Sequence, residues 1–272
     1  MFQLGFQTLD VRDEQLDLNI TCNLFYPSIS EEHSYQAGPF TIRLAEGGTP
    51  APGDFPLIVI SHGSGGSNWV YRELAAGLAK AGFVVCLPLH PFNNRFDNGW
   101  SVKPDNLKHR PRHLGLVAQY CQQNLPFVTP GKVGWAGHSV GGYSALCAGG
   151  AQSQWFTNGS NCYDPIMLMA PSLSCFLEGG EFSKVQGSVW VVQGDLDTDE
   201  DGQMLHWLTA QLSKITTDLV TDANHYSFLS PFPKALAHRV GVASKDVIGF
   251  DRPEFLRRLV HQSVSFFEEL KT

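Results

Sequence analysis

Short runs of aliphatic and β-branched residues alternate along the chain with longer amphipathic segments. The runs predict strands buried on both faces, which are continuously apolar, at about residues 56–61, 83–89, 132–136, 166–170, 188–193 and 217–221. The amphipathic segments predict helices at about residues 68–81, 107–123, 201–213 and 252–270. A short helix is also expected in the loop between 170 and 188. Such alternation of strand and helix is typical of a mostly parallel sheet.

The N-terminal part has a different pattern. Within residues 11–26, Leu16, Leu18, Ile20 and Cys22 alternate with polar neighbours, which predicts an antiparallel hairpin. Residues 27–50 are rich in Ser, Glu, Gly and Pro and are expected to be irregular. The predicted fold class is therefore α/β, with a mostly parallel central sheet, an antiparallel N-terminal hairpin and helices on both faces.

Length and composition favour one domain that spans residues 1–272. The chain is longer than most domains, but single α/β domains reach this length, and 43% hydrophobic residues can fill a core on both sheet faces. The formal net charge is -7, and the densest basic cluster is the short run 108–112. This balance argues against a nucleic-acid partner and leaves a small molecule as the expected one.

The chain start lacks the basic residues and long apolar core of a secretory signal, and apolar runs such as 83–89 are too short to cross a membrane. We therefore expect a cytoplasmic protein without a transmembrane segment, whose six cysteines are reduced thiols. Cys162 and Cys175 flank the strand predicted at 166–170. The sequence leaves open whether these two cysteines pair, and it leaves the oligomeric state open as well.

Residues 137–141 read Gly-His-Ser-Val-Gly and carry the strongest chemical signal. A predicted strand precedes this G-x-S-x-G pattern, and a helix rich in small residues follows it. In that setting the central serine, Ser139, stands on a sharp turn and can act as a nucleophile. The helix N-terminus beside it favours negative charge.

A serine hydroxyl needs a base to remove its proton. Asp195 and Asp197 follow the strand at 188–193, and His225 follows the strand at 217–221. The carboxyl ends of parallel strands gather site residues at one sheet edge, so an acid and a histidine placed there can meet Ser139. The residues alone do not decide between the two aspartates.

The strand at 56–61 ends in Ser-His-Gly-Ser-Gly-Gly, residues 61–66. Glycines there let backbone N–H groups approach a ligand closely. In an acyl-transfer site these groups would hold the oxyanion, together with the N–H of Val140, the residue after the nucleophile. Ser64 is our candidate for the second donor.

Together these motifs resemble those of α/β-hydrolases, in particular the dienelactone-hydrolase-like group and its branch that includes the platelet-activating-factor acetylhydrolases. Further matching segments are 87–91, Leu-Pro-Leu-His-Pro; 110–111, Arg-Pro; 224–229, Asn-His-Tyr-Ser-Phe-Leu; and 249–253, Gly-Phe-Asp-Arg-Pro. The resemblance spans about residue 15 to the C-terminus. The chain departs from it twice. Dienelactone hydrolases proper use a cysteine where Ser139 stands, and Arg112 and His113 occupy positions where the branch usually has an acidic residue.

The resemblance implies a serine hydrolase that cleaves carboxylic esters through a Ser139–His225–Asp197 triad and an acyl-enzyme. The expected substrates are small or short-acyl esters. It selects Asp197 as the acid, because the acid of these families usually stands three residues after the glycine of this loop. A thioesterase, peptidase or acyltransferase could use the same triad, and a catalytically silent binding protein could share the fold.

No metal or organic cofactor is expected. The run of Asp195, Asp197, Asp199 and Asp201 lacks the terminal glutamate of a twelve-residue calcium loop. Two segments with aromatic residues, 92–106 and 226–250, are predicted to be loop insertions over the site. His62, His90 and His138 also lie near the motifs, and we expect none of them to be the base.

Overall fold

The computed structural model describes residues 1–101, 103–157, 160–197 and 201–272, without the side chains of 201–203. Its strands are β1 (Gln3–Asp13), β2 (Leu18–Ser28), β3 (His33–Ala37), β4 (Phe40–Glu46), β5 (Phe55–Ser61), β6 (Val84–Pro88), β7 (Val128–Ser139), β8 (Ile166–Pro171), β9 (Val189–Gly194) and β10 (Ile215–Val220). Its α-helices are α1 (Arg72–Lys80), α2 (Pro104–Asn124), α3 (Val140–Ala148), α4 (Asp201–Gln211), α5 (Lys234–Val240) and α6 (Arg252–Phe267). Short 3₁₀ turns are η1 (Ser174–Phe176), η2 (Gly241–Ser244) and η3 (Glu268–Lys271).

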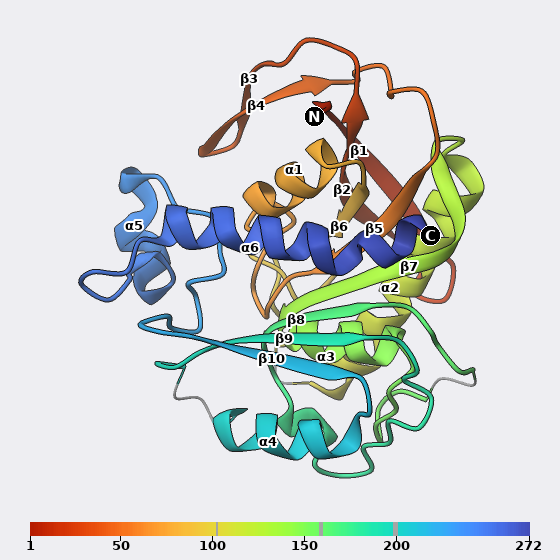
Figure 1. Cartoon of the computed structure of the whole chain (residues 1–272), viewed down its shortest axis with the longest axis vertical. Coiled ribbons are helices and arrows are strands. Elements are labelled where there is room, and N and C mark those ends of the chain that lie inside the picture. Colours follow the sequence, from red (N-terminus) through yellow and green to blue (C-terminus); the bar gives the residue numbers. More distant parts are fainter. Residues whose placement is uncertain (102, 158–159, 198–200) are drawn as a thin grey trace.

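The described strands form one sheet in the order β10-β9-β8-β7-β5-β6-β2-β1-β4-β3. From β10 to β6 every neighbouring pair is parallel. The strands β2 and β1 then continue the sheet as a long antiparallel hairpin. The predicted fold class is confirmed: the sheet is mostly parallel with an antiparallel N-terminal hairpin (Figure 1).

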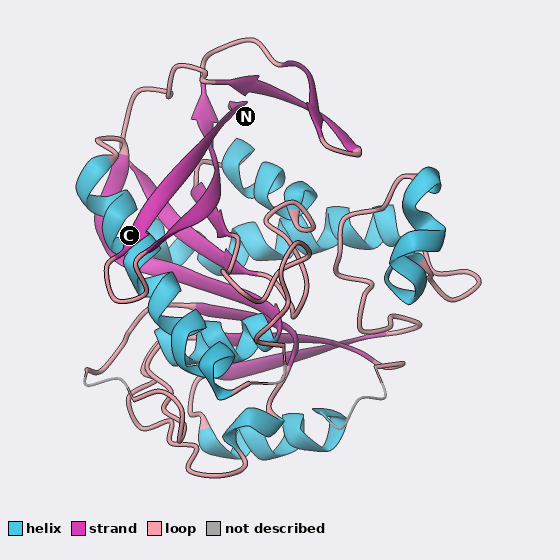
Figure 2. Ribbon diagram, turned by 180° about the vertical axis from the view of Figure 1, so that it is seen from behind, coloured by secondary structure: helices cyan, strands magenta, loops and turns pink. Residues whose placement is uncertain are grey.

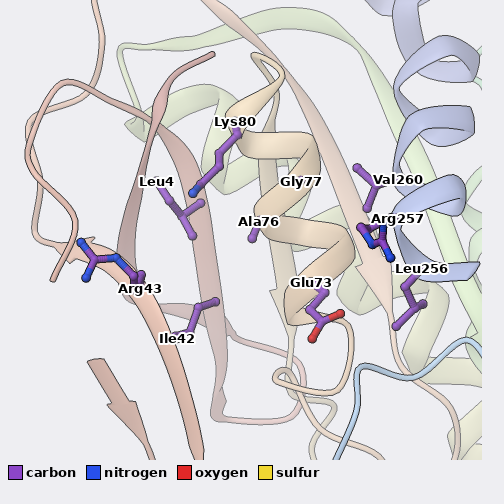
Figure 3. Close-up of a pocket in the computed structure, with 10 residues that line it drawn as sticks. All are labelled: Leu4, Ile42, Arg43, Glu73, Ala76, Gly77, Lys80, Leu256, Arg257 and Val260. Carbon is purple, nitrogen blue, oxygen red and sulfur yellow. The ribbon is translucent and has the colours of Figure 1, made fainter. Parts of the chain in front are cut away.

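Helices cover both faces of this sheet, as Figure 1 and Figure 2 show from opposite sides. Along β5 the buried side chains alternate between two hydrophobic clusters. Leu57 and Val59 pack with residues of α2, α3 and α4, whereas Ile58 and Ile60 pack with residues of α1 and α6. Successive side chains of a strand point to opposite faces, so a continuously apolar strand needs this two-sided cover.

Parts of the fold differ from the sequence-based expectation. The hairpin predicted within residues 11–26 is longer than expected and spans β1 and β2, from Gln3 to Ser28. Residues 27–50 were expected to be irregular, but they contain β3 and β4, which pair antiparallel. Gly38 sits in the turn between them with φ +58, a conformation that glycine adopts without strain. In the segment 226–250, expected to be loop, the structure forms α5 and η2.

The parallel strands bring several chain segments to one edge of the sheet. The strands β5, β7, β8 and β9 end at Ser61, Ser139, Pro171 and Gly194, and β10 ends shortly before His225. None of the six cysteines forms a disulfide, Cys162 and Cys175 included. None of the helices in the described ranges is both long and apolar enough to cross a bilayer.

Candidate active site

Ser139 stands on a strained turn between β7 and α3. Its φ of 56° and ψ of -128° lie in a region that non-glycine residues rarely occupy. Such a conformation costs on the order of 1–3 kcal/mol and persists only where the surroundings impose it. The turn projects Ser139 at the carboxyl end of a central strand, and α3 begins at the next residue.

The glycines of the motif make this turn possible. A Cβ on Gly137 would lie 2.0 Å from the backbone oxygen of Gly141, and a Cβ on Gly141 would lie 2.2 Å from the backbone oxygen of Ser61. Both distances are far inside van der Waals contact. The helix start therefore packs directly on β7 and on the end of β5, and only glycine fits at these two positions.

A second serine, which the sequence analysis did not identify, holds the turn from the side of β8. The Ser172 backbone N–H donates to the Ser139 carbonyl at 2.9 Å, and the two hydroxyl oxygens lie 3.4 Å apart. Ser172 follows the last residue of β8, the neighbour of β7. Its place directly after an apolar strand was the only available signal.

His225 and Asp197 are in direct contact. The His225 Nδ1–H donates to Asp197 Oδ2 at 2.9 Å, and the Gln193 side-chain amide donates to the same oxygen at 2.8 Å. Asp197 is almost fully buried, which strengthens a charged hydrogen bond. Asp195, in contrast, is exposed, and its N–H donates to the backbone oxygen of Val220.

The other histidines near the motif have different partners. The His138 Nε2–H donates to the backbone oxygen of His225 at 2.7 Å, and burial lowers the pKa of His138 to about 3. His62 donates from Nδ1 to the Gly63 carbonyl at 2.7 Å, and burial likewise lowers its pKa to about 3. His90 lies 2.9 Å from the Ser61 hydroxyl. Burial lowers the pKa of His90 as well, so all three rings are neutral at physiological pH. His62 and His138 hold backbone carbonyls, whereas His90 holds the side chain of Ser61.

The loop after β5 lies against the turn at Ser139. A Cβ on Gly63 would come within 3.3 Å of Ser139 Cβ, which shows how closely the two backbones approach. Val140 is the first residue of α3, where backbone N–H groups have no partner within the helix. In the described part of the chain, neither the Ser64 nor the Val140 N–H donates a turn, loop or cap hydrogen bond.

Ser139, His225 and Ser64 share one cavity of about 580 Å³. Its walls come from several segments, including Arg95 of the segment 92–106 and a series of residues from 226–250. The lining residues outside the segments that the sequence analysis placed at the site are Phe40, Ser67, Val70 and Tyr71. The cavity is thus mainly apolar and opens directly onto the nucleophile turn.

Among the described residues, no three His, Cys, Asp or Glu side chains lie close enough together to hold a metal ion. Asp199 of the aspartate run lies outside the described residues, as does the side chain of Asp201.

The sequence was compared with family models and with curated proteins. Residues 34–94 match the family model described as platelet-activating factor acetylhydrolase, isoform II. No curated protein matches the sequence.

Solved structures match over nearly the whole chain. A ferulic acid esterase from Streptomyces cinnamoneus has a TM-score of 0.71 at 16% identity, with 98% of this chain and 90% of that chain covered. A dienelactone hydrolase from Anabaena variabilis has a TM-score of 0.58 at 15% identity, with 98% of each chain covered. An S-formylglutathione hydrolase from Staphylococcus aureus has a TM-score of 0.59 at 11% identity, with 98% and 97% covered.

At these identities the structural matches establish the fold alone. The family match is a similarity over 61 of the 272 residues. The chain therefore has the α/β-hydrolase fold. It is similar in structure to a dienelactone hydrolase and, over residues 34–94, similar in sequence to the platelet-activating factor acetylhydrolases.

Proposed function

We propose that this protein is a serine hydrolase that cleaves carboxylic esters of small molecules, short-acyl esters included, through an acyl-enzyme on Ser139. The observation that carries the proposal is the Asp197–His225 hydrogen bond beside the strained Ser139, with Ser139 and His225 lining one cavity. A nucleophile, a base and a carboxylate that orients the base are the parts that acyl transfer requires.

In the first half of the reaction His225 takes the proton from the Ser139 hydroxyl as the serine oxygen attacks the ester carbonyl. His225 uses Nε2 for this step, because its Nδ1–H is bound to Asp197. The buried carboxylate fixes that tautomer and stabilises the imidazolium that forms. His225 then gives the proton to the leaving alcohol.

The negative charge on the tetrahedral intermediate is held by the N–H groups of Val140 and Ser64. Hydrogen-bond donors that are already in position stabilise the transition state strongly, because negative charge develops next to them. The loss of one such donor typically raises the activation barrier by on the order of 3 kcal/mol. In the second half of the reaction, water repeats the sequence with the acyl-enzyme and frees the acid. No step needs a metal ion or an organic cofactor.

The cavity supports a small-molecule ester as the substrate. A volume of about 580 Å³ is within the range of ordinary small-molecule sites, and apolar residues such as Phe40, Phe232 and Leu236 form much of the lining. Such a wall can accept the hydrocarbon part of an acyl group or of an alcohol. The shape of the cavity, rather than the triad, determines whether esters are preferred over thioesters and amides.

The test is a substrate panel on the purified protein. It comprises p-nitrophenyl acetate, butyrate and octanoate, a thioester and a p-nitroanilide. We expect hydrolysis of the esters, and Ser139→Ala should lower kcat/KM by at least about three orders of magnitude. Ser183→Ala, an exposed serine outside the cavity, should leave it unchanged. Ester hydrolysis that survives Ser139→Ala, or no turnover by the wild type, would refute the proposal.

A further inference from the structure

Arg110 is a buried cation without a carboxylate partner among the described residues. It belongs to α2 and is only 1% exposed. Burial lowers the pKa of its guanidinium to about 9, which still leaves it charged at neutral pH. Burying a charge without a counter-ion costs free energy unless hydrogen bonds compensate for it. The acceptors of Arg110 are therefore the groups to identify.

The hydrogen bonds of Arg110 converge on the end of β5 and the loop after it. One nitrogen, Nη2, donates to the Ser61 hydroxyl at 3.1 Å and to the His62 carbonyl. The other, Nη1, donates to the side-chain oxygen of Asn93. The guanidinium therefore holds the residue directly before Gly63, which packs against Ser139.

Asn93 extends this connection to the other side of Gly63. Its side-chain amide donates to the Ser64 hydroxyl at 3.0 Å and to Asn98 Oδ1 at 2.7 Å. One guanidinium thus fixes His62 directly and Ser64 through Asn93.

The contacts of the loop carbonyls fix the orientation of its N–H groups. The Ser64 N–H belongs to the peptide whose Gly63 carbonyl accepts from His62 Nδ1 at 2.7 Å, and the Gly63 N–H belongs to the preceding peptide, whose His62 carbonyl accepts from Arg110. In a trans peptide the carbonyl and the N–H point in opposite directions. Since the His62 carbonyl is directed at Arg110, the Gly63 N–H points away from it. A hydrogen bond from a charged donor is about twice as strong as a neutral one, so it holds this peptide plane firmly.

A neighbouring arginine on the same helix has a carboxylate partner. Arg112, two residues later in α2, forms an ion pair with the buried carboxylate of Asp13, and its Nη1 donates to Asp13 Oδ1 at 2.9 Å. Asp13 thus pairs with Arg112, whereas Arg110 donates to the neutral acceptors Ser61, His62 and Asn93.

We propose that Arg110 is a positioning residue for the oxyanion hole: through the His62 carbonyl and through Asn93 it holds the backbone N–H groups of residues 63–64 in the orientation that receives the oxyanion. The inference rests on the proposed ester hydrolysis at Ser139. It predicts that Arg110 acts on the transition state and not on substrate binding, because the bound ester carries no charge on its carbonyl oxygen.

The test compares Arg110→Lys and Arg110→Gln with Arg112→Lys, the same substitution two residues later in the same helix. We would measure kcat and KM on p-nitrophenyl butyrate, and the inhibition constant of a trifluoromethyl ketone, whose hemiketal oxyanion mimics the intermediate. Lysine keeps the charge but cannot reach two acceptors in the fork geometry. Both Arg110 variants should lose about 100-fold in kcat with KM changed less than threefold. Ketone inhibition should weaken in proportion to the loss of kcat/KM, and Arg112→Lys should retain kcat.

Several outcomes would overturn the inference. These are an unchanged kcat in the Arg110 variants, a loss confined to KM, a loss of kcat without weaker ketone inhibition, or an equal loss in Arg112→Lys. If the Arg110 variants do not fold, Asn93→Ser decides, because it cuts the connection to Ser64 and leaves Arg110 in place. That variant must lower kcat and weaken ketone inhibition together. Failure of the proposed function itself looks different, since the wild type would then show no Ser139-dependent turnover.

Discussion

The Nδ1 of His225 lies 2.9 Å from Oδ2 of the nearly buried Asp197, whereas Asp195, two residues earlier, is exposed and bonded through its backbone to β10. The two aspartates follow the same strand, and the turn at 194–197 separates their environments. This geometry favours Asp197 as the group that orients the base of the proposed reaction.

The first prediction uses the two aspartates as a matched pair. Asp197→Asn should lower kcat by several orders of magnitude, because an amide can stabilise the wrong tautomer of His225 for accepting the serine proton. Asp195→Asn should leave kcat within about threefold. Steady-state kinetics on one p-nitrophenyl ester check both values. The opposite ranking would assign the acid to Asp195.

A second prediction concerns the close approach of backbones at the nucleophile turn. Gly141→Ala would place a Cβ 2.2 Å from the Ser61 backbone oxygen, so it should disrupt the turn and remove activity. Gly115→Ala is the control, because Gly115 lies exposed in α2 with no atom within 4 Å of the new Cβ. It should stabilise the protein by about 0.5–1 kcal/mol, as alanine does in place of glycine inside a helix. Urea unfolding and activity measurements on both variants test the pair, and an active, stable Gly141→Ala would contradict it.

The third prediction is loss of stability in mild acid. Burial lowers the pKa values of His62, His113 and His138 to about 3 in the folded protein, against an ordinary value of 6.5. Below pH 6.5 the unfolded chain binds protons at these rings and the folded chain does not, so the free energy of unfolding falls with pH between about 6.5 and 3. Each ring contributes up to about 1.4 kcal/mol per pH unit in this window.

Urea unfolding at pH 7, 6 and 5 measures this effect. The free energy of unfolding should decrease steadily, and His113→Gln should show a smaller decrease because one of the rings is gone. A free energy that stays flat between pH 7 and pH 5 would mean that these rings are protonated in the folded state.

Much of the parallel sheet could be predicted from the sequence. The strands around β5, β8 and β9 are continuously apolar, and each predicted boundary lies within one residue of the structure. A strand that helices bury on both faces has no polar positions to obscure its pattern. The nucleophile turn was equally readable, because its glycines are required by contacts between neighbouring backbones.

The hairpin of β3 and β4 was missed for a physical reason. Its surroundings are rich in turn residues, and only the alternation of Phe40, Ile42 and Leu44 with polar neighbours marked β4. This alternation covers only a few residues of a half-buried strand. The prediction of irregular structure therefore followed the composition of the segment instead.

The residues around the site that the sequence did not reveal share a different property. Ser172 was not identified from the sequence. Arg95 and Arg110 lie in segments that the sequence analysis named, but their individual contacts join segments far apart in the chain, such as the bond between Arg110 and Ser61. No local pattern encodes such contacts. The choice between Asp195 and Asp197 likewise needed either the resemblance to a family or the geometry of the folded turn.

The most direct test of the account is covalent labelling of the wild-type protein with a fluorophosphonate, followed by mass spectrometry of its peptides. We predict a single adduct, on Ser139, with loss of esterase activity in proportion to labelling, and no adduct in Ser139→Ala. Labelling of another serine with parallel loss of activity, or full activity after complete labelling of Ser139, would contradict it.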